Sequence, residues 1–365
     1  MFAFVFGKNW MLSLAEILSY FEREGVKWSF VDLTKKAFMV EAEIWPEMIN
    51  DLGGTLKIVQ IDKWFEFKDI KEQDFGSYID WPISFYGSHE LFKDVKKIFT
   101  RFDPTEGVNS HTWLIEKRKT EVCLIFGLKA SYFGETVAVS NPYDFKKRDT
   151  GRPKQRPELS ISPSRARILV NLSQARESIL DPFCGIGTIG QEAILAGVQR
   201  VYMGDIDKKA VEWTKLNLEW ARKAFKKKAS ITVKTMDAKN LSLHGIQAIA
   251  TEPDLGPKMR YRPGKHDGTQ IIHYLTSLYR TFFKSAHNVL IANGRLAVVL
   301  PCINTTAGKI FVNKRFEGYR PIDMFEKIPG DYREYLKIRK TILDEEREEG
   351  KTRVVVREFC VYRKV

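Results

Sequence analysis

Cysteine is scarce in this sequence, and its few copies form no recognisable pattern. The four cysteines lie far apart in the 365 residues, with no Cys-x-x-Cys pair among Cys123, Cys184, Cys302 and Cys360. This spacing gives neither a zinc knuckle nor a framework of disulfides. We therefore expect no metal site and a reducing environment, the cytoplasm.

Long apolar runs are also missing. No stretch approaches the roughly 20 apolar residues that a membrane helix needs. The segment Met1–Lys8 lacks the cationic start and the cleavage site of a signal peptide. No internal repeat or low-complexity tract is visible. We expect no membrane partner and a chain of two or three domains, because 365 residues exceed one typical domain.

Acidic residues are too few to balance the basic ones. The formal net charge is +13, although residues 1–76 hold 9 basic against 13 acidic side chains. The basic excess lies further along the chain, with 36 against 23 in residues 158–365. A solvated basic surface is one explanation, but an excess of this size favours a polyanionic partner. Nucleic acid fits better than a membrane, since no amphipathic basic helix stands out.

The stretch from Ser178 to Gly190 organises the rest of the chain. An apolar run ends at Asp181, the chain turns through Gly185 and Gly187, and a helical pattern begins at Thr188. This order predicts a buried strand, a glycine loop and a helix whose first amides face the loop. Asp205 follows a second apolar run, 20 residues beyond Gly185. At that spacing a carboxylate is placed to accept hydrogen bonds from ribose hydroxyls.

Two cofactors fit this loop, and its composition separates them. The letters Gly185-x-Gly187-x-x-Gly190 match the dinucleotide pattern of NAD sites. However, Asp181 just before the loop would repel a pyrophosphate, whereas it suits the ammonium group of S-adenosylmethionine (SAM). A glycine loop can also serve only a tight turn, but here the strand, the helix and the distal acid occur together. We therefore favour SAM over NAD.

The chain before this loop divides into three parts. Residues 1–76 predict a β-α-β-β-α-β order, the ferredoxin-like arrangement, with strands at about 2–6, 28–33, 37–44 and 55–61. Residues 77–142 predict a second small unit, with a helix at about 89–101 and four strands at about 82–86, 111–117, 121–127 and 135–140. Residues 143–162 form a polar, basic linker that should lie on the surface.

Residues 163–365 predict a Rossmann-like α/β domain. Ser162 and Pro163 have the types that prefer the N-cap and N1 positions, so they predict the start of its first helix. The charged segment 331–349 predicts a helix, and residues 352–362 predict a closing antiparallel strand at the sheet edge.

At this point a family resemblance is clear. The chain resembles the THUMP-domain tRNA methyltransferases, most closely the archaeal and eukaryotic type that methylates the exocyclic amine of guanosine ten. The matching motifs are Arg148-Asp-x-Gly-Arg-Pro153, Ile161-Ser-Pro-Ser164, Asp181-Pro-Phe-Cys-Gly-x-Gly-Thr188, Gly204-Asp-Ile-Asp207 and Met236-Asp-Ala238. The resemblance implies a ferredoxin-like domain, a THUMP domain for residues 77–142 and a class I SAM methyltransferase domain. It also implies tRNA as the partner, and we expect a monomer.

The resemblance further implies a set of cofactor-binding residues. Asp181 and its loop would line the methionine part of SAM, Asp205 would hold the ribose, and Ile206 and Asp237 would meet the adenine. The full set is Asp181, Phe183, Cys184, Gly185, Gly187, Thr188, Asp205, Ile206, Asp237 and Ala238. Without the family pattern, Asp237 alone could equally be a loop or cap aspartate.

The catalytic segment departs from the family pattern. Thr251-Glu-Pro-Asp-Leu-Gly-Pro257 stands where such amino-methyltransferases usually carry Asp-Pro-Pro-Tyr or Asn-Pro-Pro-Tyr. The lone pair of guanine N2 is delocalised, so two acceptors must draw on its protons while an aromatic ring stacks on the extruded base. Glu252 and the carbonyl of Pro253 can be those acceptors. Asp254 cannot stack.

Three explanations for Asp254 remain open. The segment can represent a subfamily in which another aromatic residue, for instance Phe183 or Tyr261, stacks on the base. The substrate base can instead differ, with Asp254 accepting hydrogen bonds from N1 and N2 of guanine. Finally, the site can be catalytically weak and the protein a tRNA binder. We take the catalytic residues to be Glu252, Pro253 and Asp254, with direct methyl transfer and no covalent intermediate.

Two basic runs follow along this domain. The segment 258–265, Lys-Met-Arg-Tyr-Arg-Pro-Gly-Lys, comes after the catalytic segment, where contacts to phosphate and a merely solvated loop are both reasonable. The run 222–228 ends a helix, where cations suit the helix dipole.

The first alternative function is an amino-methyltransferase of rRNA or DNA, and an NAD-dependent oxidoreductase is a further one.

Overall fold

The computed structural model describes residues 1–66, 83–87, 121–156, 160–344 and 354–365. The chain forms two compact units. The first contains Met1–Phe145 together with Lys327–Ile338, and the second contains Lys146–Glu326 and Arg339–Val365. A short piece of the C-terminal half is therefore part of the N-terminal unit. The two units are described separately below.

The first unit begins with the predicted β-α-β-β-α-β order. Its elements are β1 (Phe2–Phe6), α1 (Trp10–Glu24), β2 (Trp28–Leu33), β3 (Ala37–Ala42), η1 (Pro46–Asp51) and β4 (Thr55–Phe65). The second helix is a short 3-10 helix. Asn9 caps α1 by accepting a hydrogen bond from the Leu12 amide, and Gly25 ends the helix in the left-handed conformation.

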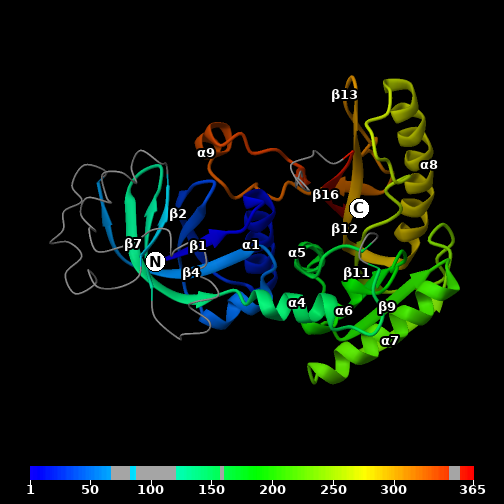
Figure 1. The fold of residues 1–365 in the computed structure, drawn as a ribbon, viewed down its shortest axis with the longest axis horizontal. Helices are drawn as coiled ribbons and strands as arrows, with labels where there is room; N and C mark the ends of the chain where they lie inside the picture. The colour runs from blue at the N-terminus through cyan, green and yellow to red at the C-terminus, as the bar shows by residue number, and fades with distance from the viewer. Residues whose placement is uncertain (67–82, 88–120, 157–159, 345–353) are drawn as a thin grey trace. The chain divides into compact units, whose positions relative to one another are not determined.

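The sheet of the first unit then continues into the next segment of the chain. It adds β5 (Ile83–Tyr86), β6 (Val122–Phe126) and β7 (Ser131–Val139) in the order β2-β3-β1-β4-β7-β6-β5. Since β4 pairs with β7, the described strands on both sides of the boundary expected at residue 76 share one sheet (Figure 1). The helix expected at 89–101 and the strand at 111–117 lie outside the described residues.

The helix predicted over 331–349 is wrong. Within its described residues, 331–344, the helix α9 (Gly330–Tyr335) ends at Tyr335, and Ile342–Asp344 forms a strand, β15. α9 belongs to the first unit, where Tyr332 donates a hydrogen bond of 2.7 Å to Oδ1 of the buried Asp32. The ring of Tyr332 also packs edge-to-face on Phe30 at 4.7 Å. These long-range contacts explain why the charged run does not continue as one helix.

The second unit has the predicted doubly wound α/β architecture. Its parallel strands are β8 (Ser178–Asp181), β9 (Arg200–Asp205), β10 (Ser230–Thr235), β11 (Ile246–Thr251) and β12 (Leu290–Thr305), in the order β10-β9-β8-β11-β12. Its main helices are α5 (Pro163–Ser173), α6 (Thr188–Leu195), α7 (Lys208–Ala224) and α8 (Lys265–Val289). The strand order reverses between β8 and β11, which places a ligand crevice at their carboxyl ends.

The sheet is completed by antiparallel strands. β16 (Val355–Lys364) pairs with β12 on one side, and with β14 (Tyr319–Pro321) and β15 on the other. It is therefore not the edge strand that we predicted. β13 (Gly308–Phe311) folds back on β12 as a hairpin. Both α5 and α8 pack on β12, and they lie on opposite sides of it in Figure 1.

Helix α8 illustrates why these residues form the core. Its buried positions recur at helical spacing, and they pack into one cluster with the strands. The members from α8 include Ile272, Leu275, Tyr279, Phe282 and Phe283. In the part of the chain that the structure describes, no helix is long and apolar enough to cross a membrane.

Candidate active site

Two cavities lie at the carboxyl ends of the strands. The larger is about 580 Å³ and the smaller about 70 Å³, and Phe183 and Glu252 line both. Of the predicted site residues, Asp181, Cys184, Gly185 and Thr188 line the smaller cavity, while Asp205, Ile206, Asp237, Ala238, Pro253 and Asp254 line the larger. Only Gly187 lines neither. The predicted residues therefore come together, although they span more than 70 positions.

The glycine loop has the local geometry that its sequence predicts. Gly185 and Gly187 both adopt positive φ angles, +54° and +85°. A Cβ on Gly187 would lie 3.0 Å from Thr214 Cγ2, so this position favours glycine for space as well as for conformation. The amide of Cys184 donates to the carbonyl of Gly204 at 2.8 Å, which ties the loop to the end of β9.

Asp181 closes β8 and is 1% exposed. Its Oδ1 accepts hydrogen bonds from the Thr251 hydroxyl at 2.6 Å and from the Phe183 amide at 3.1 Å. Burial raises the pKa of Asp181 to about 7, although both hydrogen bonds act in the opposite direction. The carboxyl group is thus poised to gain or lose its proton near neutral pH, beside the smaller cavity.

Asp205 is oriented by the backbone around it. Its Oδ2 accepts from the Gly185 amide at 2.9 Å, and its Oδ1 accepts from the Asp207 amide at 3.0 Å. The next residue, Ile206, is 70% exposed and lines the larger cavity. A fixed carboxylate beside an exposed apolar side chain is a suitable surface for a ribose and the face of a purine.

Asp237 and Ala238 follow β10 on the same side of the larger cavity. Oδ1 of Asp237 accepts from the Lys239 amide at 2.9 Å, and its carbonyl accepts from the Asn240 amide at 2.9 Å. The aspartate therefore does cap a turn, as the simpler interpretation required. It lines the cavity at the same time, so the two interpretations do not exclude each other.

Glu252 is held by a residue that the sequence did not single out. Arg357 of β16 donates from Nε to Oε2 at 2.7 Å and from Nη2 to Oε1 at 3.0 Å. Both side chains are largely buried, at 11% exposure for Glu252 and 18% for Arg357. Burial alone would lower the pKa of Arg357, but the hydrogen bonds and charge of Glu252 raise it overall. The one available signal was a charged pair, Arg357-Glu358, inside an apolar strand.

Asp254 does not point its carboxylate into a closed pocket. The residue is exposed at the wall of the larger cavity, and its Oδ1 accepts from the Gly256 amide at 3.0 Å. The Tyr279 hydroxyl donates to the Asp254 carbonyl. Neighbouring Pro253 is buried and lines the same cavity. Of the two candidate stacking residues, Phe183 lines both cavities, whereas Tyr261 lines neither.

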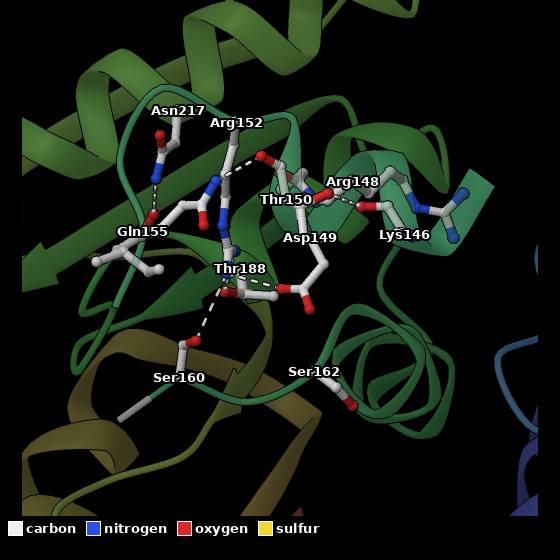
Figure 2. A network of polar contacts seen from close by, with 12 residues as sticks. Lys146, Arg148, Asp149, Thr150, Arg152, Gln155, Ser160, Ser162, Thr188 and Asn217 are labelled. Atoms are coloured by element: carbon white, nitrogen blue, oxygen red, sulfur yellow. Dashed lines mark hydrogen bonds and ion pairs between the residues drawn. The ribbon is translucent and has the colours of Figure 1, made fainter. Parts of the chain in front are cut away.

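The basic linker is less exposed than predicted. It begins as a helix, α4 (Pro142–Thr150), and Arg148 and Arg152 are buried, so the expectation of an exposed linker is wrong at these positions. Arg152 donates to the hydroxyl of Thr188 at 2.7 Å and to Asp149 at 3.1 Å (Figure 2). Figure 2 shows this network beside the first residue of α6. The linker therefore fixes the helix start behind the glycine loop.

Comparison with known proteins shows what this region is similar to. The family model described as RMKL-like, methyltransferase domain (UPF0020) matches residues 152–315. This segment is therefore similar to a methyltransferase domain. The match favours a methyl donor over NAD for the glycine loop.

Curated relatives of the chain extend this result. The chain is 38% identical over 156 residues to a tRNA (guanine(10)-N2)-dimethyltransferase of Methanothermobacter thermautotrophicus, over 41% of this chain and 42% of that protein. A Pyrococcus abyssi protein of the same name is 28% identical over 246 residues, 67% of this chain and 68% of its own. The family resemblance predicted from the motifs is thereby confirmed. The first alignment spans less than half of that relative's length.

A solved structure confirms the fold over the whole chain. TrmN from Thermus thermophilus aligns with 100% of this chain and 99% of its own, with a TM-score of 0.55 and 16% identity. At this identity the match shows a shared fold alone. The predicted fold class, a Rossmann-like domain preceded by a ferredoxin-like and a THUMP domain, is therefore confirmed as an N-terminal sheet domain followed by a Rossmann-like sheet.

Proposed function

We propose that this chain is a SAM-dependent tRNA methyltransferase that modifies the exocyclic N2 amine of a guanosine. The observation that carries the proposal is the position of Glu252, which lines both cavities. The smaller cavity borders the glycine loop, and the larger is open enough for a base. SAM would extend from the glycine loop into the larger cavity, and the carboxylate of Glu252 borders both the cofactor residues and the space left for a base.

The residues around the cavities fit SAM. The carboxylate of Asp181 borders the smaller cavity and suits the ammonium group of the methionine part, while Asp205 suits the ribose hydroxyls. Ile206, Asp237 and Ala238 would surround the adenine. When bound, SAM supplies an electrophilic methyl group. The chain itself contributes the orientation of both ends of the cofactor.

Glu252 and Pro253 would act on the substrate amine. A guanine N2 nitrogen has a delocalised lone pair, so it becomes nucleophilic only when its two protons are held by acceptors. The carboxylate of Glu252 and the carbonyl of Pro253 supply two such acceptors, and the fork from Arg357 fixes the first one. Catalysis would come from alignment of the amine with the methyl group rather than from a covalent intermediate.

We further propose that tRNA binds through more than this site. Residues 77–142 would form the THUMP domain, following the ferredoxin-like residues 1–76, and residues 143–162 connect it to the methyltransferase domain. The basic excess of the chain suits a polyanion. All four cysteines are free and buried, which is consistent with the reducing cytoplasm in which we expect a monomer to act.

Nucleoside mass spectrometry tests the proposal directly. Purified protein, methyl-labelled SAM and a tRNA transcript should yield N2-methylated or N2,N2-dimethylated guanosine. A matched transcript with inosine at the modified position lacks the exocyclic amine and should accept no label. Label on a different atom, or on rRNA or DNA in preference to tRNA, would overturn the assignment of the substrate.

Glu252→Gln separates an enzyme from a tRNA binder. The amide retains one acceptor oxygen but loses the negative charge and the paired fork from Arg357. We expect methylation to fall at least tenfold while SAM binding persists. Equal modification by this variant and by the wild type would remove Glu252 from the mechanism, and no modification by either would leave a binding protein.

A further inference from the structure

Helix α8 packs against the catalytic segment that follows β11. The hydroxyl of Tyr279 donates to the carbonyl of Asp254, and a Cβ on Gly256 would lie 3.2 Å from Ile271 and 3.3 Å from Leu275. The backbone from Asp254 to Gly256 therefore packs closely on one face of α8. This packing fixes the position of the neighbouring α8 side chains relative to the larger cavity.

Tyr274 is one of those side chains, and it is largely exposed. It lines the larger cavity together with Pro253 and Asp254, yet it is 66% exposed. With the described residues its side chain forms no hydrogen bond and no ring contact. The other aromatic residue of the cavity, Phe183, packs edge-to-face on Phe282 at 5.2 Å, within the core cluster. Tyr274 is thus the aromatic side chain of this cavity that presents most of its surface to a ligand.

Exposed cations continue from the cavity along the loop that precedes α8. Lys258 lines the cavity, and Arg260, Arg262 and Lys265 are exposed beyond it. The loop is tied to the β12–β13 hairpin, because the Thr306 amide donates to the Pro263 carbonyl at 3.0 Å. The hairpin adds a further exposed cation, Lys309. The positive surface thereby extends from the loop to the hairpin.

We propose that this surface, the cavity rim formed by Tyr274, Lys258, Arg260, Arg262, Lys265 and Lys309, is where the RNA strand that carries the target guanosine docks. The inference rests on the proposed function. A base must leave its stack to reach the methyl group, and an aromatic ring stabilises such a base in a way that tolerates its identity. The phosphates on either side of the extruded nucleotide need cations at the cavity mouth.

The two components of the rim support each other. A solvated loop would explain the cations, but it would not explain an exposed aromatic ring in the cavity wall. Similarly, an isolated exposed tyrosine would not require basic residues beside it. The rim also explains how Asp254, which cannot stack, can occupy its position: its side chain binds the Gly256 amide, and the ring comes from α8.

Tyrosine variants test the stacking role. Tyr274→Ala should lower kcat/KM for tRNA by about tenfold, while Tyr274→Phe, which keeps the ring, should retain wild-type kinetics. SAM affinity and thermal stability should be unchanged in both. Tyr335→Ala is the matched control, because Tyr335 is 69% exposed and belongs to the first unit. Equal kcat/KM for Tyr274→Ala and wild type would overturn the stacking role.

Charge variants test the phosphate contacts. In the double variant Arg260→Gln/Arg262→Gln, tRNA should bind more weakly, and the slope of log K against log salt should fall by about 1.5. Lys227→Gln/Lys228→Gln removes the same charge from another exposed run and should leave the slope unchanged. Equal slopes for the Arg260→Gln/Arg262→Gln variant and wild type would exclude the rim as a phosphate site. If wild-type protein methylates no tRNA, the proposed function fails, whereas these slopes still test the rim.

Discussion

Arg357 of β16 and Glu252, the residue after β11, form a two-point fork in which both oxygens of the carboxylate are engaged at 2.7 and 3.0 Å. The residues are 105 positions apart in the chain. Asp344 is the cross-strand partner of Arg357 in β15 and also pairs with Arg165 of α5. The antiparallel end of the sheet therefore positions the proposed acceptor of the substrate protons.

Replacing Arg357 should impair methyl transfer more than cofactor binding. Arg357→Lys keeps a positive charge but not the planar fork, and Arg357→Gln loses both. We expect kcat to fall about tenfold in Arg357→Lys and further in Arg357→Gln, because an unpaired, largely buried carboxylate would move toward water. Steady-state kinetics with tRNA, alongside calorimetric SAM titrations, would measure both effects.

The control for Arg357 is Arg320→Gln. Arg320 is exposed on β14, which also pairs with β16, so its removal changes the net charge by the same amount outside the cavity. Its kinetics should match the wild type. If Arg357→Gln retained full kcat, the Arg357–Glu252 pair would stabilise the sheet without contributing to methyl transfer.

The strand, glycine loop and helix around Asp181 could be predicted because their signals are local. Apolar runs, glycines and the acid at the end of β9 lie within one βαβ unit, and the fold brings them together as expected. Arg357 and Tyr274 could not be found in this way. Arg357 meets Glu252 only through pairing of distant strands, and Tyr274 resembles any exposed residue on an amphipathic helix.

Errors in the fold have the same origin. The 331–349 segment has a helical composition, but Tyr332 binds the buried Asp32 and Ile342 pairs with Phe359, so tertiary contacts decide the structure of its described part, residues 331–344. Arg148 and Arg152 lie in a polar run that indicates solvent exposure. Arg148 nevertheless pairs with the buried Glu192 at 2.9 Å, a contact that a local pattern cannot reveal.

SAM affinity should depend on the protonation of Asp181. The pKa of Asp181 is about 7 in the ligand-free protein, so below that pH the carboxyl group carries a proton. It must lose this proton before it can pair with the ammonium group of SAM. Affinity should therefore rise from about pH 6 to about pH 8, where the amino group of the ligand begins to lose its own proton. Calorimetry across this range would show the rise. Asp181→Asn should bind SAM weakly at every pH, and an unchanged pH profile in this variant would exclude Asp181 as the titrating group.

Folding stability should show the opposite trend at the same residue. A carboxyl whose pKa is raised by burial binds its proton more tightly in the folded state, so stability is lost as pH rises from about 4 to about 7. Asp181→Asn carries no charge and escapes this loss. Without SAM, the variant should be more stable than wild type at about pH 8, by about 2–4 kcal/mol, and the difference should vanish near pH 4. Urea unfolding at both pH values would measure it, and a less stable variant at the higher pH would contradict the prediction.

A glycine pair can separate backbone strain from crowding in the cofactor loop. Gly187 and Gly197 have φ angles of +85° and +86°, at the start and just beyond the end of α6. A Cβ on Gly187 would lie 3.0 Å from Thr214, whereas a Cβ on Gly197 would meet nothing within 4 Å. Alanine at either position should destabilise the fold by about 1–2 kcal/mol through left-handed strain. Only Gly187→Ala should also displace the loop and weaken SAM binding. Thermal unfolding would measure the loss of stability in both variants, and calorimetry would measure their SAM affinities. Equal SAM affinities in the two variants would mean that the loop tolerates the added methyl group.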